Sequence, residues 1–195
     1  MKKAVPRGGV YAACIIAIIA LMYGCHPAAP PPTAAPTAAP PAAAQTENRV
    51  SRPDLALTYV LPAGWHDQQP PEPGTVIHIT KANPDGIDPF IQMVSQKAAS
   101  DKLSPDVVQT MEDAAKQHYN EYKRVSATSM QIDRTEAQEL QFTCRLKTAN
   151  AEVHEYSVMT NRSGQLYVVK AMMGKKDAEK FGAEVDQFLQ SIRWK

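Results

Sequence analysis

Alternating apolar and polar positions predict strands along the second half of the chain and most of its middle. The first such run spans residues 54–61, where one side carries Leu55, Leu57, Tyr59 and Leu61. This period of two is typical of a half-buried strand. The same criterion predicts strands at 75–80, 90–95, 140–147, 152–160 and 165–173, with a short additional one at 130–134. Turn signals separate these strands, including Asn-Pro-Asp-Gly at 83–86 and Asn-Arg-Ser-Gly at 161–164.

Two segments instead show the helical period. Ser104, Pro105 and Asp106 are favourable N-terminal residues for a helix over 106–124. The apolar side of that helix is predicted to carry Val107, Met111, Ala114, His118 and Tyr122. A second helix begins after Asp177 and buries a stripe made of Phe181, Val185, Phe188, Leu189 and Ile192.

The order of these elements predicts an α+β fold. Short turns between neighbouring strands favour antiparallel meanders, and two helices with one apolar face each must cover the sheet. We therefore expect a mostly antiparallel sheet of about six to seven strands under two main helices, formed by residues 49–195.

The first part of the chain has a different pattern. Lys2, Lys3 and Arg7 precede an uninterrupted apolar run at 10–23, which is shorter than the roughly 20 residues that a membrane-spanning helix needs. A basic flank before a short apolar run is typical of a secretory signal, here residues 1–24. Removing it leaves 18 basic against 20 acidic residues, because the whole chain has 21 and 20. This mild negative charge, together with export, argues against a nucleic-acid partner.

Leu21-Met22-Tyr23-Gly24-Cys25 resembles the lipobox of bacterial lipoproteins. The resemblance implies that Cys25 becomes the acylated N-terminus, with palmitate among its chains, and that the membrane is a partner through this lipid anchor. Met22 and Tyr23 depart from the preferred residues, and an uncleaved signal anchor is the alternative. Because His26 is not aspartate, the resemblance also implies the outer membrane, facing the periplasm, in a host with two membranes.

Residues 26–44 contain only His, Pro, Ala and Thr, with seven prolines. Proline favours an extended polyproline II conformation, so this linker, part of a disordered segment at 25–48, has a reach of about 60 Å at roughly 3.1 Å per residue. A tether is favoured over a ligand for proline-binding domains, because no basic residue is present to orient such a ligand.

The Leu-Pro-x-Gly-Trp sequence at 61–65, the order of elements and the closing Phe-Leu-x-Ser-Ile at 188–192 resemble the PsbP-like superfamily. Its members include photosystem II extrinsic proteins, a Ran-binding nuclear-import factor and bacterial lipoproteins similar to DcrB, which this chain resembles most. The resemblance implies a non-enzymatic binding or assembly module. It carries over neither a catalytic residue nor a cofactor.

No motif for nucleophilic catalysis, phosphate binding or a helical metal pair is present, so we predict neither a catalytic residue nor a metal site. His78 and His154 could line one face of the sheet, although satisfied or solvated histidines are the more common case. Trp65 could shape a ligand groove with Pro70–Pro73, or it could pack under its own loop. Cys144 lies in the apolar alternation of 140–146 and is expected to be a buried free thiol.

Together these features predict an exported, membrane-tethered binding or assembly module with a monomeric domain. Its partner is an unidentified protein or small ligand of the envelope, and Trp65, His78 and His154 are the candidate contact residues. An enzyme whose site assembles only in the folded chain is the alternative, and a purely structural spacer is a third, disfavoured by the full-sized core.

Overall fold

The computed structural model describes residues 48–70, 73–98, 100 and 102–195. In chain order the elements are β1 (Arg49–Arg52), η2 (Pro53–Leu55), β2 (Leu57–Val60), β3 (His66–Asp67), β4 (Thr75–Thr80), β5 (Phe90–Lys97), α1 (Val107–His118), β6 (Asn120–Ile132), β7 (Thr135–Arg145), β8 (Glu152–Arg162), β9 (Gln165–Gly174), η3 (Lys175–Asp177), α2 (Ala178–Ser191) and β10 (Arg193–Trp194).

Seven strands form one sheet in the order β3-β4-β5-β9-β8-β7-β6, and every neighbouring pair is antiparallel. Two meanders, β3–β5 and β6–β9, therefore join side by side through the pairing of β5 with β9. A second, small sheet has the order β1-β2-β10 and brings the beginning and the end of the domain together. The predicted α+β class and the number of strands are confirmed.

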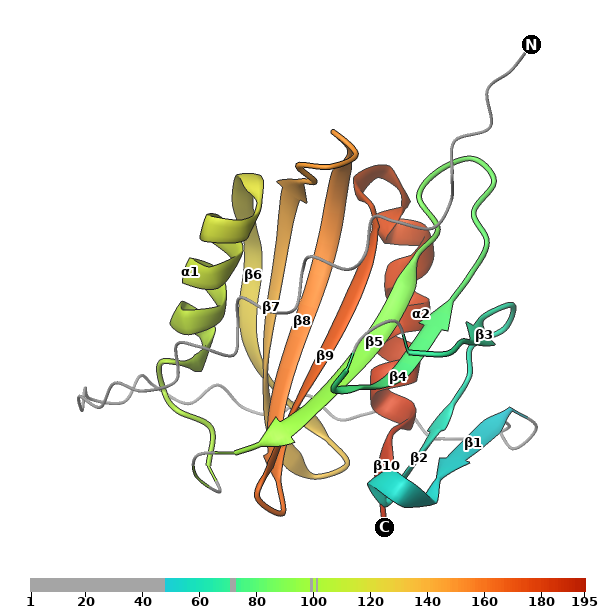
Figure 1. Cartoon of the computed structure of the whole chain (residues 1–195), viewed down its shortest axis with the longest axis vertical. Coiled ribbons are helices and arrows are strands. Elements are labelled where there is room, and N and C mark those ends of the chain that lie inside the picture. Colours follow the sequence, from blue (N-terminus) through green and yellow to red (C-terminus); the bar gives the residue numbers. More distant parts are fainter. Residues whose placement is uncertain (1–47, 71–72, 99, 101) are drawn as a thin grey trace.

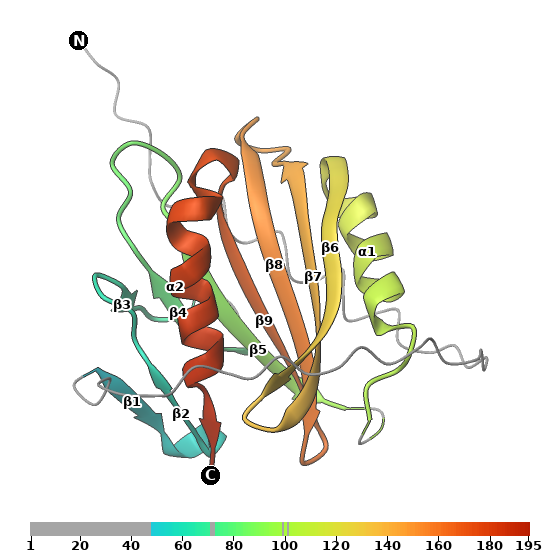
Figure 2. The same ribbon diagram turned by 180° about the vertical axis from the view of Figure 1, so that it is seen from behind.

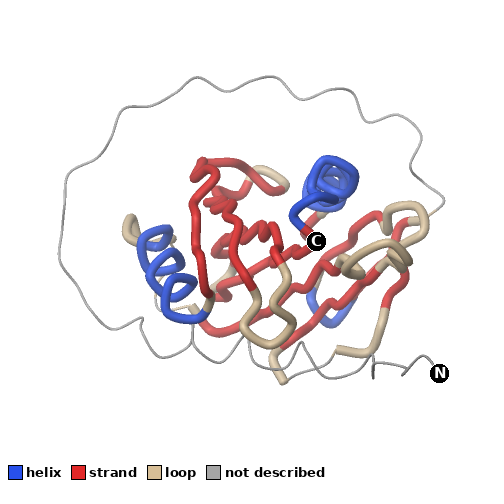
Figure 3. Tube along the Cα trace, turned by 90° about the horizontal axis from the view of Figure 1, so that it is seen from above, coloured by secondary structure: helices blue, strands red, loops and turns tan. Residues whose placement is uncertain are grey.

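The two helices cover opposite faces of the large sheet, so the domain has an α/β/α arrangement (Figures 1, 2 and 3). The α2 stripe predicted from the sequence is fully buried against one face, with Phe181, Val185 and Phe188 at 0% exposure. On the other face, Leu140, Phe142, Cys144 and Leu146 pack with α1 in a separate core, as their alternation predicts. Cys144 is buried, as expected. In the part of the chain that the structure describes, no helix is both long and apolar enough to cross a membrane.

The helix predicted over 106–124 is too long, because α1 ends at His118. Tyr119 is already extended, with φ −103° and ψ 157°, and β6 begins at Asn120. Tyr122 therefore lies on a strand, where its ring packs on Phe142 with centroids 5.0 Å apart. The chain is extended from Tyr119 because β6 pairs with β7 along nearly its whole length. The short strand predicted at 130–134 is the last part of β6. The helix also begins later than the Ser104 cap predicts, with Asp106 at the N-cap.

The strand predicted over 54–61 is shorter in the structure. Pro53–Leu55 forms a 3-10 helix, and Ala56 follows in the left-handed region with φ 49°. The strand β2 starts only at Leu57, and Leu57 and Tyr59 are the two fully buried residues of the predicted side. Proline favours this local turn because its fixed φ suits the start of a helix.

Candidate functional site

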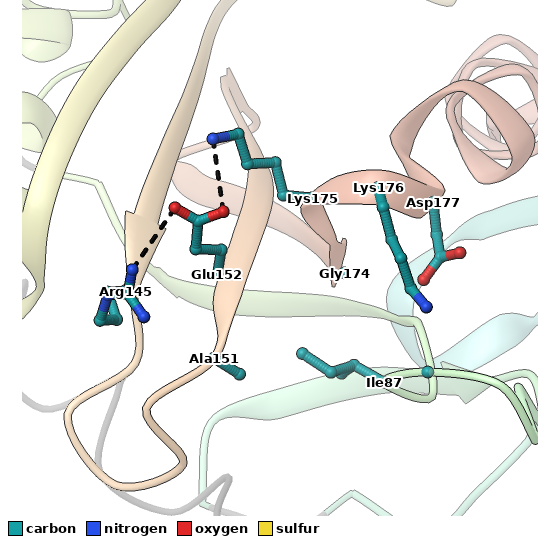
Figure 4. Close-up of a pocket in the computed structure, with 9 residues that line it drawn as sticks. Ile87, Arg145, Ala151, Glu152, Gly174, Lys175, Lys176 and Asp177 are labelled. Atoms are coloured by element: carbon teal, nitrogen blue, oxygen red, sulfur yellow. Dashed lines mark hydrogen bonds and ion pairs between the residues drawn. The ribbon is translucent and has the colours of Figure 1, made fainter.

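A pocket of about 800 Å³ lies where β7 and β9 end, β8 begins and the chain enters α2 (Figure 4). The loop between β7 and β8 and the start of α2, which contribute to its lining, lie at the opposite end of the domain from β1 and the C-terminus (Figure 1). Three separate segments contribute its lining, namely Gly86, Ile87, Arg145, Ala151, Glu152, Gly174, Lys175, Lys176 and Asp177.

Hydrogen bonds around Asn83 hold the loop between β4 and β5 against the start of α2. The buried Asn83 side chain donates from Nδ2 to the Ile87 carbonyl and to Asp177 Oδ2, each at 3.2 Å. The Asn83 backbone N–H donates to Asp88 Oδ1 at 2.7 Å. One buried amide therefore fixes the wall of the pocket that carries Gly86 and Ile87.

Two glycines leave room for the Asp177 carboxylate. A Cβ on Gly174 would lie 2.7 Å from Asp177 Oδ2, and a Cβ on Gly86 would lie 2.8 Å from the same atom. Such distances are far inside van der Waals contact, so an alanine at either position would displace the carboxylate from Asn83.

The charged side chains of the pocket form a loose network around Glu152. Lys175 Nζ lies 3.4 Å from one Glu152 carboxylate oxygen, and Arg145 Nη2 lies 3.5 Å from the other (Figure 4). Arg145 also pairs with Glu121 at 2.9 Å, while Lys176 Nζ donates to the Asp85 carbonyl at 3.0 Å. These ion pairs are solvent-accessible, and pairs of this kind contribute roughly 0–1 kcal/mol. An incoming anion can therefore replace them at small cost.

The lining favours binding of an anionic group. It contains three cations and two carboxylates, and α2 begins directly after Asp177, whose side chain does not cap the helix. The N-terminal end of a helix favours negative charge, and here the Ala178 N–H already donates to the Lys175 carbonyl. Among the described lining residues there is no serine, cysteine or histidine to act as a nucleophile or a base.

Trp65 lies in the core and not on a surface, with 2% of its area exposed. Its Nε1–H donates to Glu184 Oε2 at 2.6 Å, and its ring meets Phe181 edge-on at 6.5 Å. Lys81 Nζ forms an ion pair with Oε1 of the same Glu184 carboxylate at 2.8 Å. Trp65 is therefore buried, and α2 supplies both the ring contact and the acceptor for the indole.

The structure does not bring His78 and His154 to one face of the sheet. Strand pairing aligns His78 on β4 with Gln92 on β5, Lys170 on β9 and Ser157 on β8, so these four side chains lie on the same face of the sheet. His154 is three residues before Ser157 on the same strand. Because successive side chains of a strand alternate, His154 faces the opposite side, where α2 packs. Both histidines are at least nine-tenths buried, and burial lowers the pKa of each imidazole. His154 packs on Tyr156 with centroids 4.9 Å apart.

The predicted lipidation residue Cys25 lies outside the described residues. Nothing in the sequence around Arg145 and Glu152 indicated that these residues would line a pocket. The adjacent lysines Lys175 and Lys176 precede the helix that begins after Asp177; such a pair can form a small cationic patch, although it more commonly only adds solubility.

No protein-family model matches this chain, and no curated protein is similar to it in sequence. Solved structures do resemble it. The solution structure of cyanobacterial PsbP (CyanoP) from Synechocystis sp. PCC 6803 has a TM-score of 0.56 at 17% identity, over 75% of this chain and 91% of that chain. The domain has a PsbP-like fold.

Two further structures show the same PsbP-like fold. LpqN, involved in cell envelope biogenesis of Mycobacterium tuberculosis, has a TM-score of 0.53 at 12% identity, over 70% of this chain and 81% of its own. A putative regulator of unknown function from Pseudomonas aeruginosa has a TM-score of 0.52 at 13% identity, over 69% of this chain and 88% of its own.

Proposed function

We propose that this protein is an exported bacterial lipoprotein whose PsbP-like domain is a non-enzymatic binding or assembly module of the envelope. Cys25 carries the lipid anchor, and residues 26–44 are the tether. The domain binds its partner through the pocket at the end of β7, the start of β8 and the end of β9. The pocket's charges and the start of α2 favour a partner that presents an anionic group.

The observation that carries this proposal is the placement of the pocket relative to the tether. Residues 26–44 precede β1 in the sequence. The strand ends and the start of α2 that line the pocket lie at the far end of the domain from β1 (Figure 1). A domain attached at one end and open to ligands at the other suits capture of a partner away from the anchoring membrane.

Two further points support the proposal. LpqN, which shares the fold, is involved in cell envelope biogenesis. The bacterial DcrB-like lipoproteins that the sequence resembles combine a lipobox and a linker with this kind of domain, as residues 21–48 do here.

Replacement of the lipidated cysteine tests the anchor. In a bacterial host, Cys25→Ala is expected to abolish incorporation of a labelled fatty acid and to leave the protein soluble or as the unprocessed precursor. Cys14→Ala, which removes the other cysteine of the apolar segment, is the matched control and should label normally. Unchanged labelling of Cys25→Ala would refute lipidation at this residue.

Photo-crosslinking in cells tests the pocket as the binding surface. A photoreactive residue at the exposed Lys176 is expected to give a discrete crosslinked species, and the same residue at the exposed Ser51 on β1 should not. Crosslinking from Ser51 alone would place the partner at the opposite end of the domain and would contradict the proposal.

A further inference from the structure

The outward face of the small sheet β1-β2-β10 is basic. Strand pairing places Ser51 on β1 beside Thr58 on β2, and Thr58 beside Arg193 on β10, so these side chains share one face. Arg49 Nη1 donates to Thr58 Oγ1, and Lys195 Nζ donates to Ser51 Oγ, each at 3.0 Å, which adds two more cations to the same face. These five residues, here called the basic face, include three cations and no acidic side chain.

The cations of the basic face are exposed and have no acidic partner. No ion pair with a carboxylate is recorded for any of the three within the described part of the chain. Two acidic residues that contact the small sheet are engaged elsewhere. Asp54 pairs with Arg52 at 2.8 Å, and Asp133 accepts the backbone N–H of Trp194 at 2.8 Å. The positive charge of this face is therefore open to an anionic partner.

The two arginines of the basic face are held in place by the end of α2. Arg193 Nη1 donates to the carbonyls of Gln190 and Ile192 at 2.6 and 2.7 Å. Arg49 Nη1 donates to the Ser191 carbonyl at 3.2 Å. Cations are favoured at a helix C-terminus, so these contacts fix both guanidinium groups. The hydrogen bonds recorded for them within the described residues use only Nη1, which leaves Nε and Nη2 as the planar fork that matches a phosphate group.

Further cations lie at the same end of the domain. The Arg162 guanidinium lies 5.4 Å from the centre of the Trp194 ring on β10. Strand register aligns Arg162 with Gln165, and Gln165 with the exposed Lys97 at the end of β5. The hairpin between β8 and β9 and the end of β5 lie toward the same end as β1, β2 and β10 (Figure 1). Cations therefore gather at this end, although acidic residues outnumber basic ones by 20 to 18 after the predicted signal.

We propose that the basic face docks the folded domain on the anionic phospholipid surface of the membrane to which its N-terminal segment attaches. Residues 26–44 precede β1, and β1 is part of the basic face, so the tether brings this face to the membrane at a high effective concentration. Each lysine or arginine near an anionic leaflet raises membrane affinity about fivefold. Because the folded domain makes this contact, the inference goes beyond the lipid anchor proposed for Cys25. Docking leaves the far end of the domain, with the pocket segments, open to a partner (Figure 1).

Photolabelling of the full chain reconstituted into vesicles tests the docking. Either the lipid or an uncleaved apolar segment anchors the chain there, so a failure of lipidation and a failure of docking give different results. A photoreactive residue at Ser51 is compared with one at Lys176, and lipid attached to the protein is measured by mass. On vesicles of phosphatidylcholine with phosphatidylglycerol, Ser51 is expected to label lipid strongly and Lys176 weakly. On phosphatidylcholine alone, or in 1 M salt, where the screening length is about 3 Å, both positions should label weakly.

Charge variants provide the matched comparison. Arg193→Gln with Lys195→Gln removes two cations from the basic face, which should lower the affinity for phosphatidylglycerol vesicles about 25-fold and reduce Ser51 labelling to the level on phosphatidylcholine. Lys123→Gln with Lys147→Gln removes the same charge from exposed positions elsewhere and should leave Ser51 labelling unchanged. If the first variant does not fold, the salt dependence of the unsubstituted chain remains decisive.

Two results would overturn the proposal. One is equal lipid labelling from Ser51 on vesicles with and without phosphatidylglycerol. The other is crosslinking of Ser51 in cells to an acidic protein in place of lipid, which would assign the basic face to a protein partner. Lipid contact itself gives no crosslinked protein, so Ser51 remains a valid control for the pocket.

Discussion

Substitution of Trp65 by phenylalanine tests whether this residue is structural. The indole Nε1–H donates to Glu184 at 2.6 Å, and Lys81 binds the same carboxylate at 2.8 and 3.0 Å. These contacts connect the loop before β3, the end of β4 and the middle of α2. Phenylalanine keeps the edge-on ring contact with Phe181 but removes the donor and part of the ring volume.

The expected loss follows from these two changes. A hydrogen bond to a charged acceptor contributes about 1.5–3 kcal/mol. The smaller ring leaves a void in a residue position that is 98% buried, which adds about 1 kcal/mol. Trp65→Phe should therefore lower the free energy of unfolding by about 2.5–4 kcal/mol, a large share of the stability of an ordinary domain.

Urea unfolding at constant pH measures this loss of unfolding free energy. An m-value equal to that of the unmodified protein would show that the substitution does not change the compactness of the folded or the unfolded state. Trp194→Phe is the matched control, because Trp194 Nε1 has no hydrogen-bond partner within the described residues, and its loss should be at least 1 kcal/mol smaller. A double-mutant cycle with Glu184→Gln should give a coupling of about 0.5–3 kcal/mol. If Trp65→Phe and Trp194→Phe have equal effects and the cycle shows no coupling, the structural role of the indole is wrong.

Three further outcomes are expected. Gly174→Ala should destabilise the domain by about 1–3 kcal/mol in thermal unfolding, because its Cβ would meet Asp177, and the cost should largely disappear in an Asp177→Ala background. Burial lowers the pKa of His154 below its unfolded value near 6.5, so the unfolded chain binds more protons just below that pH. Stability should fall as the pH decreases from 7 through the folded-state pKa, by at most about 1.4 kcal/mol per pH unit for this group, and urea unfolding of His154→Gln should show a shallower pH dependence. A chain that begins at Arg49 should be folded and monomeric by circular dichroism and sedimentation, and a chain that remains unfolded would show that the domain boundary lies elsewhere.

Local patterns in the sequence sufficed for the elements whose conformation depends on near neighbours. The α2 stripe from Phe181 to Ile192 and the turn at 161–164 are such cases, since helical period and turn chemistry act within a few residues. The end of α1 was not predictable in this way. His118 and Tyr122 continue the helical spacing, but pairing of β6 with β7, a contact between distant segments, makes the chain extended from Tyr119.

The pocket could not be predicted because its walls come from three parts of the chain. Ile87, Arg145 and Lys176 are separated by tens of residues, and only the pairing of β5 with β9 and of β7 with β8 brings their loops to one end. The histidines show the same limit. Alternation within a strand tells which residues of that strand lie on the same side. Whether His78 on β4 and His154 on β8 lie on the same face of the sheet depends on the register across β5 and β9, and this register places them on opposite faces.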